Sequence, residues 1–135
     1  MTRDETRLIV DSNPAEVPHL QARLSTLCGE AGLDDLGGFQ LTCAVVEAVN
    51  NCIEHTFRGE TGHQITLRWI RQQDSVSVEI RDQGEPMPAL PAESPELPEP
   101  DAESGRGWHI IYQWTDRVTY ARQGNENVLT LTRRL

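Results

Sequence analysis

The sequence has 135 residues, a hydrophobic fraction of 37% and a net charge of −9, which fits one folded domain over residues 1–135. The negative charge argues against binding to nucleic acid or to an anionic membrane, because both partners need a basic surface. No apolar run is long enough to span a bilayer and the first residues lack the hydrophobic core of a signal peptide, so we expect a cytoplasmic protein.

The first predicted elements are a strand and two helices. Residues 6–10 are mostly apolar or β-branched, which is typical of a strand. Pro14 follows a group of capping residues, and apolar residues then recur at helical spacing up to Gly29 or Gly32, which predicts a first helix. Glycine and aspartate over residues 34–38 predict a break before a second helix over residues 41–55.

The three cysteines, Cys28, Cys43 and Cys52, all fall in these helices. Their number is odd and no pair has CxxC spacing, so neither a disulfide framework nor a zinc site is expected. We predict that all three are buried as small hydrophobic side chains.

The second helix carries Glu47 and Asn51 four residues apart, so that the two side chains stand one turn above each other. A carboxamide oxygen can bind a hard metal ion, and a neighbouring carboxylate can take a proton from a hydroxyl or a water molecule. A solvated helix flank is the alternative interpretation of this pair.

Two alternating segments follow, over residues 64–71 and 75–81, and they predict an antiparallel hairpin with one solvent-facing side. The second strand leads directly into Asp82, and Gly84 follows two positions later. A glycine there lets the backbone turn sharply and approach a ligand to which the carboxylate can hydrogen-bond.

Residues 85–104 contain six of the eight prolines and six acidic residues, but no basic residue. Such a segment cannot bury enough apolar surface to become ordered by itself, so we expect it to be extended and mobile. Too little chain follows it for a second domain, so we interpret it as a lid over a ligand rather than as a linker.

Gly105, Arg106 and Gly107 lead into a predicted helix over residues 108–114, where free backbone N–H groups leave room for an anion. A strand pair over residues 117–122 and 127–133 ends the chain. All twelve basic residues are arginine. The absence of lysine excludes a P-loop and the strand lysine of ordinary protein kinases, so a nucleotide would need another scaffold.

In this order the motifs resemble those of the GHKL, or Bergerat-fold, ATPases, which include DNA gyrase, MutL and sensor histidine kinases. The small size resembles the stand-alone anti-sigma-factor serine/threonine kinases of bacterial partner switching. Residues 47–55 match the N box, residues 82–84 the G1 box and residues 105–107 the G2 box. The resemblance implies an α+β fold, a two-layer α/β sandwich whose mixed, mainly antiparallel sheet has helices on one face and a mobile ATP lid over about residues 85–104.

The resemblance also implies ATP and Mg²⁺ as cofactors. By this analogy Glu47 would be the catalytic base and Asn51 the Mg²⁺ ligand, and Asp82 would bind the adenine amino group while Gly84 lets the base lie close. The remaining implied contacts are to the phosphates and come from Gly105, Arg106 and Gly107. For His55, a phosphate contact and a structural hydrogen bond both remain open.

The implied function is that of an ATP-dependent protein serine/threonine kinase. It would phosphorylate an anti-anti-sigma protein of the STAS type, act as an anti-sigma factor and form a homodimer. An alternative is a nucleotide-dependent protein-binding module with another target and little or no kinase activity. A histidine kinase ATPase domain and an α/β domain that binds no nucleotide are further alternatives.

The sequence departs from the family pattern at two places. Glu85 and Pro86 follow Gly84 where the family has a second glycine, which would stiffen the root of the lid. The family's Gly-Thr before the last strand is replaced by residues 125–127, Asn-Glu-Asn, which leaves open whether adenine is contacted there. The acidic lid would also repel a triphosphate, which predicts weak nucleotide binding.

Overall fold

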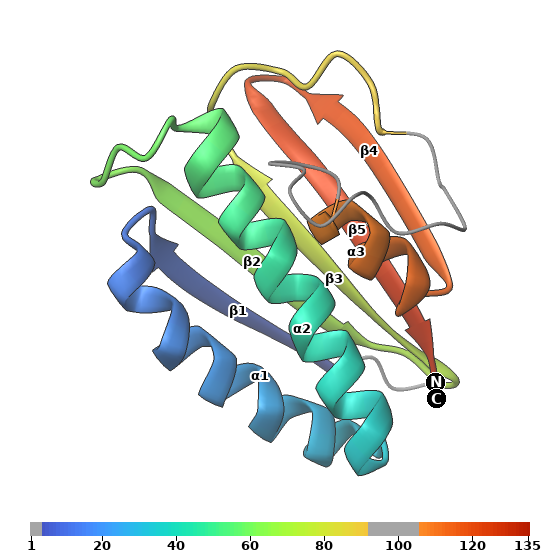
Figure 1. The fold of residues 1–135 in the computed structure, drawn as a ribbon. Helices are drawn as coiled ribbons and strands as arrows, with labels where there is room; N and C mark the ends of the chain where they lie inside the picture. Colours follow the sequence, from blue (N-terminus) through green and yellow to red (C-terminus); the bar gives the residue numbers. More distant parts are fainter. Residues whose placement is uncertain (1–3, 92–105) are drawn as a thin grey trace.

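The computed structural model describes residues 4–91 and 106–135, with Arg106 described by its backbone alone. In the described residues, five strands form one sheet in the order β1-β2-β3-β5-β4 (Figure 1). Each neighbouring pair is antiparallel, which fits the mainly antiparallel sheet that the resemblance implied, although no parallel pair occurs among the described strands. The strands are β1 (Asp4–Asp11), β2 (Gln64–Arg71), β3 (Ser75–Asp82), β4 (Arg117–Gln123) and β5 (Glu126–Arg134).

The three α-helices of the described part of the chain pack on one face of this sheet, which confirms the predicted two-layer arrangement (Figure 1). A short 3₁₀ turn, η1 (Pro14–Glu16), leads into α1 (Val17–Ala31), which ends at Gly32 in the left-handed conformation. The helix α2 (Asp35–Asn51) continues into a turn of π-helix, η2 (Cys52–Thr56), and α3 (Arg106–Gln113) lies beside α2.

The predicted break over residues 34–38 is wrong, because α2 already begins at Asp35. The carboxylate of Asp34 caps the helix by accepting a hydrogen bond from the Gly37 N–H at 2.7 Å. A Cβ at Gly37 would lie 2.8 Å from that carboxylate, and a Cβ at Gly38 would lie 3.1 Å from the Cβ of Cys28 on α1. The glycines therefore allow the cap and the close contact between the helices, and they do not end the helix.

The core lies between the helices and the inward face of the sheet. Its fully buried side chains come from both layers, and they include Leu24, Leu41, Val49, Leu67 and Leu131. Cys28 and Cys52 are buried as predicted, whereas Cys43 is half-buried, and all three thiols are free. The apolar layer fixes which face of each strand looks toward the helices, because a shift by one residue would turn the apolar side chains outward.

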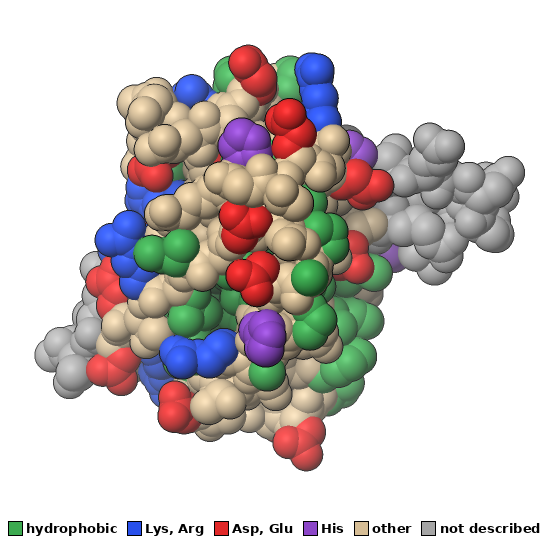
Figure 2. Space-filling view, turned by 90° about the vertical axis from the view of Figure 1, so that its left-hand side faces the viewer, with side chains coloured by type: hydrophobic (Ala, Val, Ile, Leu, Met, Phe, Trp, Pro, Cys, Tyr) green, Lys and Arg blue, Asp and Glu red, His purple; other side chains and the backbone are tan. Residues whose placement is uncertain are grey.

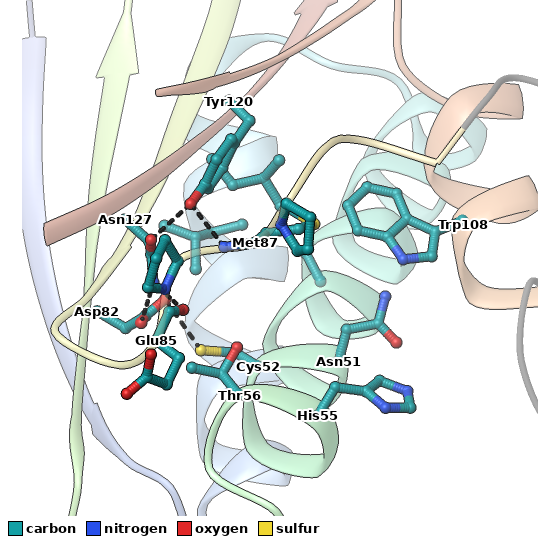
Figure 3. A pocket seen from close by; sticks show the side chains of 15 residues that line it. Asn51, Cys52, His55, Thr56, Asp82, Glu85, Met87, Trp108, Tyr120 and Asn127 are labelled. Atoms are coloured by element: carbon teal, nitrogen blue, oxygen red, sulfur yellow. Dashed lines mark hydrogen bonds between the residues drawn. The ribbon is translucent and has the colours of Figure 1, made fainter. Parts of the chain in front are cut away.

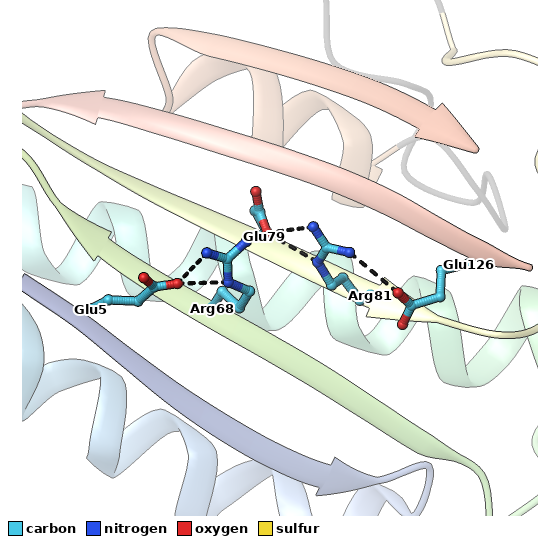
Figure 4. Close-up of polar contacts among 5 residues, drawn as sticks. All are labelled: Glu5, Arg68, Glu79, Arg81 and Glu126. Atoms are coloured by element: carbon cyan, nitrogen blue, oxygen red, sulfur yellow. Dashed lines mark hydrogen bonds and ion pairs between the residues drawn. The ribbon is translucent and has the colours of Figure 1, made fainter. Parts of the chain in front are cut away.

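The opposite face of the sheet carries a row of five charged side chains, which we call the ion-pair ladder (Figure 4). Arg68 pairs with Glu5 and, at 2.7 Å, with Glu79. Arg81 pairs with Glu79 at 3.0 Å and with Glu126 at 3.2 Å. The ladder crosses β1, β2, β3 and β5, and its alternating charges offset one another.

The side of the molecule formed by β1 and α1 shows acidic, basic and histidine side chains interspersed among small hydrophobic areas (Figure 2). The negative net charge is therefore not gathered into one continuous surface on this side. None of the helices that the structure describes has the length and hydrophobicity needed to cross a bilayer.

Candidate functional site

The strand register brings Asp82 and Asn127 together. Asp82 on β3 lies directly opposite Asn127 on β5, and both side chains are buried on the face toward the helices, with 7% and 5% of their surfaces exposed. The Asn127 Nδ2 group donates to Asp82 Oδ1 at 2.9 Å, and the Gly84 N–H donates to the same oxygen at 2.9 Å. The thiol of Cys52 donates to Asp82 Oδ2 at 3.3 Å. One carboxylate is thus held by donors from three parts of the chain.

Asn127 also holds the backbone that follows β3. Its Nδ2 group lies 2.9 Å from the carbonyl oxygen of Glu85 and 3.3 Å from that of Gly84. Because these residues begin the segment that the sequence predicts to be a lid, the root of that segment is bonded directly to the strand that carries Asn127.

Tyr120 and Arg122 on β4 extend this network. The Tyr120 hydroxyl donates to Asn127 Oδ1 at 2.6 Å and accepts a hydrogen bond from the Met87 N–H at 2.9 Å. Arg122 Nη1 donates to Asn127 Oδ1 at 3.0 Å and to the Gly84 carbonyl at 2.8 Å. Figure 3 shows Asp82, Asn127 and Tyr120 joined in one series of bonds. Hydrogen bonds thus hold the root of the predicted lid at several points, and its stiffness stays a prediction.

The π-helical turn η2 supplies the thiol in this network. The Phe57 N–H bonds to the Cys52 carbonyl at 3.0 Å, five residues back, and π-helical turns of this kind are frequent at functional sites. Burial, followed by the charge and the hydrogen bond of Asp82, raises the pKa of the Cys52 thiol far above its ordinary value. The thiol therefore keeps its proton and acts as a donor.

A cavity of about 270 Å³ opens beside Asp82, near the lower end of the range for small-molecule sites. The end of α2 and η2 form one wall, and the inward side chains of β3, β4 and β5 form another. Pro86, Met87 and Pro88 cover the cavity, and Trp108 from α3 closes one side (Figure 3). The described part of the predicted lid thus lies over a cavity.

Asn51 reaches this cavity with an unsatisfied amide. Its Nδ2 atom is buried and has no hydrogen-bond partner among the described residues, and in Figure 3 the amide points toward Trp108. An unpaired buried polar group costs about 1–3 kcal/mol, so its presence indicates a place where a ligand supplies the partner. A half-turn of the amide brings its oxygen to the same position, and such an oxygen is a suitable ligand for Mg²⁺.

Glu47 lies one turn before Asn51, under the first turn of α3. A Cβ at Gly107 would lie 2.8 Å from Glu47 Oε2 and 3.6 Å from Asn51 Oδ1, so only glycine lets the helix start so close to both side chains. The helix dipole gives this first turn partial positive charge. The predicted residues Glu47, Asn51 and Gly107 therefore do come together in space.

Two other predicted residues also lie at the site. His55 lines the cavity with 58% of its side chain exposed, and its Nε2 atom is 4.0 Å from a carboxylate oxygen of Glu54. At Gly84 an added Cβ would collide with the methyl group of Thr56 and would lie 3.2 Å from the Phe57 ring. The structure thus requires glycine at position 84 for packing against η2, and the contact with a base stays a prediction.

Part of the predicted anion site lies outside the described residues. Gly105 and the side chain of Arg106 belong to this part. Residues 92–104 of the predicted lid also lie outside the described residues. The predictions made for them therefore remain predictions.

Sequence reasoning missed three residues of the site: Cys52, Tyr120 and Asn127. Asn127 precedes Leu129 and Leu131 at the same alternation along β5, and all three are buried. A polar residue at an inward position of a strand was a signal that could have identified it. Cys52 was treated only as a small apolar side chain. The role of Tyr120 depends on strand register and had no local signal.

The sequence matches the family described as "Histidine kinase-like ATPase domain" over residues 10–133, which is nearly the whole chain. The chain belongs to this family. It is 30% identical over 81 residues to the serine-protein kinase RsbW of Listeria monocytogenes, a match that covers 60% of this chain and 52% of RsbW. The chain thus spans about half the length of these relatives.

Two other relatives are named as a protein kinase and as an anti-sigma factor. The serine/threonine-protein kinase BtrW of Bordetella bronchiseptica is 35% identical over 101 residues, covering 70% of this chain and 68% of BtrW. The anti-sigma F factor of Oceanobacillus iheyensis is 31% identical over 86 residues, covering 58% of this chain and 56% of that protein. The chain is thus similar to proteins named as protein kinases and to one named as an anti-sigma factor.

The fold is shared with a solved structure. The crystal structure of the RsbU and RsbW domains of a Mycobacterium tuberculosis protein matches with a TM-score of 0.67 and 16% identity, covering 98% of this chain and 32% of that chain. This likeness confirms the predicted two-layer α+β fold.

Proposed function

We propose that this protein is an ATP-dependent serine/threonine kinase that acts as an anti-sigma factor in bacterial partner switching. Its substrate would be a STAS-type antagonist, and it would work in the cytoplasm as a homodimer. The observation that carries the proposal is the meeting of Glu47, Asn51 and Gly107 beside the cavity that Asp82 lines. The names of the RsbW and anti-sigma F relatives support it.

In this proposal the cavity holds the nucleotide. Asp82 Oδ2 accepts a hydrogen bond from the adenine amino group, because its partner Oδ1 is already bound by two donors. The Asn51 amide oxygen holds Mg²⁺, an ion that usually takes only one or two ligands from the protein. Bound Mg²⁺ would neutralise charge on the phosphates during transfer. Gly105, Arg106 and Gly107 bind the phosphates.

Glu47 would act as the base in the transfer step. Its carboxylate takes the proton of the antagonist's serine or threonine hydroxyl, whose oxygen bonds to the γ-phosphorus as the bond to the ADP oxygen breaks. The first turn of α3 lies against Glu47, so its position decides whether that hydroxyl can approach. The new phosphate adds a charge of about −2 to the antagonist, enough to disrupt a complementary interface.

The test is transfer of labelled γ-phosphate to a STAS-domain antagonist. We expect Glu47→Ala to reduce the transfer rate at least ~100-fold while the affinity for Mg-ADP changes little, because the base acts only on the incoming hydroxyl. The matched control is Glu54→Ala, since Glu54 is 73% exposed on η2. A Glu47→Ala variant that transfers at the wild-type rate would refute the proposed base.

The same assay decides between the kinase and the alternative of a binding module. Capture of a protein that depends on ADP or ATP, with no label transferred by the wild type, would replace the kinase with a nucleotide-dependent module. Failure of the wild type to bind either nucleotide would reject both.

A further inference from the structure

Asn127 is the residue at which the wall of the cavity and the root of the predicted lid are joined. Its amide nitrogen donates to Asp82 Oδ1 and to the carbonyl oxygens of Gly84 and Glu85. Its amide oxygen accepts hydrogen bonds from Tyr120 and Arg122. With 5% of the residue exposed, both ends of this side chain are occupied within the protein.

Because all hydrogen-bonding groups of the Asn127 amide are occupied, Asn127 can influence a ligand only indirectly. The two N–H groups of the amide already face three acceptors, and the oxygen has two donors, so no hydrogen-bonding capacity is left for a direct contact. The effect of Asn127 must therefore pass through the groups that it holds. These groups are the Asp82 carboxylate and the backbone after β3.

We propose that Asn127 is a positioning residue that makes Asp82 and the segment from Gly84 to Met87 one mechanical unit. This inference rests on the proposed binding of a nucleotide in the cavity. Binding of a base at Asp82 then also fixes the residues that cover the cavity, since Asn127 bonds to both.

Tyr120 carries the connection to the covering residues. Its hydroxyl bonds to Asn127 at 2.6 Å and to the Met87 N–H at 2.9 Å. Met87 lies over the cavity, between Pro86 and Pro88. The series from Asp82 through Asn127 and Tyr120 to Met87 thus runs from the wall of the cavity to its cover. A group with a single O–H donor at position 127 could serve only one of the three acceptors that the Asn127 amide serves.

The first experiment compares Asn127→Ala with Asn125→Ala, a matched control in the exposed turn between β4 and β5. Affinity for Mg-ADP is measured by titration calorimetry, and exchange of the Gly84 and Met87 amide protons is measured by NMR. We expect Asn127→Ala to weaken Mg-ADP binding about 10- to 100-fold, because the buried carboxylate loses a donor. Exchange at both amides should become faster without any nucleotide present. The control should match the wild type in both measurements.

Asn127→Asp gives a readout that loss of packing cannot produce. The new carboxyl has nearly the same shape, and it faces the Asp82 carboxylate, the Cys52 thiol, the Tyr120 hydroxyl and the Arg122 guanidinium. A second carboxylate beside Asp82 raises the pKa of the introduced group, and once protonated that group can donate again. We expect Mg-ADP affinity, relative to wild type at each pH, to recover as pH falls from 8 to 5. Asn127→Ala should show no such recovery.

Tyr120→Phe tests the outer half of the series and keeps the bond between Asn127 and Asp82. We expect faster exchange at Met87 but not at Gly84, and about threefold weaker Mg-ADP binding, because one neutral hydrogen bond is lost. Thr119→Val on the exposed side of β4 is the control. This variant decides the matter if changes at Asn127 prevent folding.

The outcomes separate the two proposals. If the wild type binds no Mg-ADP, the proposed function fails. If the wild type binds but the Asn127 and Tyr120 variants bind as the controls do, with unchanged exchange at Met87, the nucleotide site stands and the positioning role of Asn127 is overturned.

Discussion

The two faces of β3 hold carboxylates in contrasting ways. On the open face, Glu79 pairs with the guanidinium groups of Arg68 and Arg81, and its side chain is 18% exposed. On the face toward the helices, Asp82 is held by an amide, a backbone N–H and a thiol, and the described residues offer it no ion pair. Neutral donors orient the Asp82 carboxylate without cancelling its charge, so that the charge remains available to a ligand.

The two carboxylates should differ in how much their removal costs the protein. The ladder is partly exposed to water, which can replace a lost partner, and pairs of this kind contribute about 0–1 kcal/mol each. Cys52 and Asn127, which donate to Asp82, are themselves buried, so removing the carboxylate takes away the acceptor that satisfies them. We therefore expect Glu79 on the open face to contribute to stability, and Asp82 on the inner face to contribute to the proposed site.

The largest expected effect comes from exchanging these two carboxylates for amides. Asp82→Asn should weaken Mg-ADP binding about 100-fold, or ~2.7 kcal/mol. The reason is that the new NH₂ group is itself a donor, and it would face groups that now donate to the carboxylate. Glu79→Gln should leave Mg-ADP affinity within a factor of two and lower the free energy of unfolding by at most about 2 kcal/mol, because Glu79 makes two ion pairs. Titration calorimetry and urea unfolding measure the two quantities.

The two residues are on one strand, three positions apart, so a general loss of β3 would affect both variants alike. Equal losses of affinity in Asp82→Asn and Glu79→Gln would show that the inner face has no special role in binding.

A second comparison uses two glycines of the helical layer. Gly107→Ala places a methyl group 2.8 Å from Glu47 Oε2, so we expect α3 to shift and phosphate transfer to fall about tenfold. Gly29→Ala on α1 meets no atom within 4 Å and should stabilise the protein by up to about 1 kcal/mol, because alanine favours a helix. Activity and thermal unfolding of both variants, measured side by side, test the difference. Unchanged transfer in Gly107→Ala would mean that the start of α3 has no influence on Glu47.

Local patterns predicted most of the fold. Alternation in residues 64–71 and 75–81 and helical spacing before Gly32 are properties of neighbouring residues, and the structure has these elements at nearly the predicted places. The glycines at 37 and 38 misled the prediction because their purpose lies elsewhere in the chain, at the Asp34 cap and at Cys28 on the neighbouring helix. A local rule that treats glycine as a helix breaker cannot recognise a contact between helices.

The site divides in the same way. Glu47 and Asn51 lie on one helix at a spacing that the sequence displays, so they could be proposed together. The bond between Asp82 and Asn127 depends on the register of β3 and β5, which joins residues 45 positions apart. Tyr120 enters only because β4 pairs with β5. The residues that are close in sequence could therefore be predicted, whereas those brought in by strand pairing could not.

The smallest expected effect is on stability. The hydrogen bonds around Asp82 should respond to alkaline pH, whereas the ion-pair ladder should respond to salt. Burial and then Asp82 raise the pKa of the Cys52 thiol in the folded protein, whereas an unfolded thiol titrates near ~8.5. The unfolded chain therefore loses this proton first, and stability should be full below about pH 8.5 and fall as the pH rises toward 11. The chain has no lysine, so no lysine ammonium group titrates in this range.

Cys52→Ala should flatten this alkaline decline in urea unfolding, with the buried Cys28, whose pKa is also raised by burial, retaining the remainder. Cys43→Ala should have a smaller effect and serves as the comparison, because Cys43 is only half-buried, although burial and then Glu47 raise its pKa as well. The ladder should not respond to this pH change, since the hydrogen bond to Glu5 raises the pKa of Arg68 further. It should respond instead to salt, with Arg68→Ala removing part of the loss of stability between 0.1 and about 1 M NaCl. An alkaline decline that is as steep in Cys52→Ala as in the wild type would show that the thiol is not the donor that Asp82 depends on.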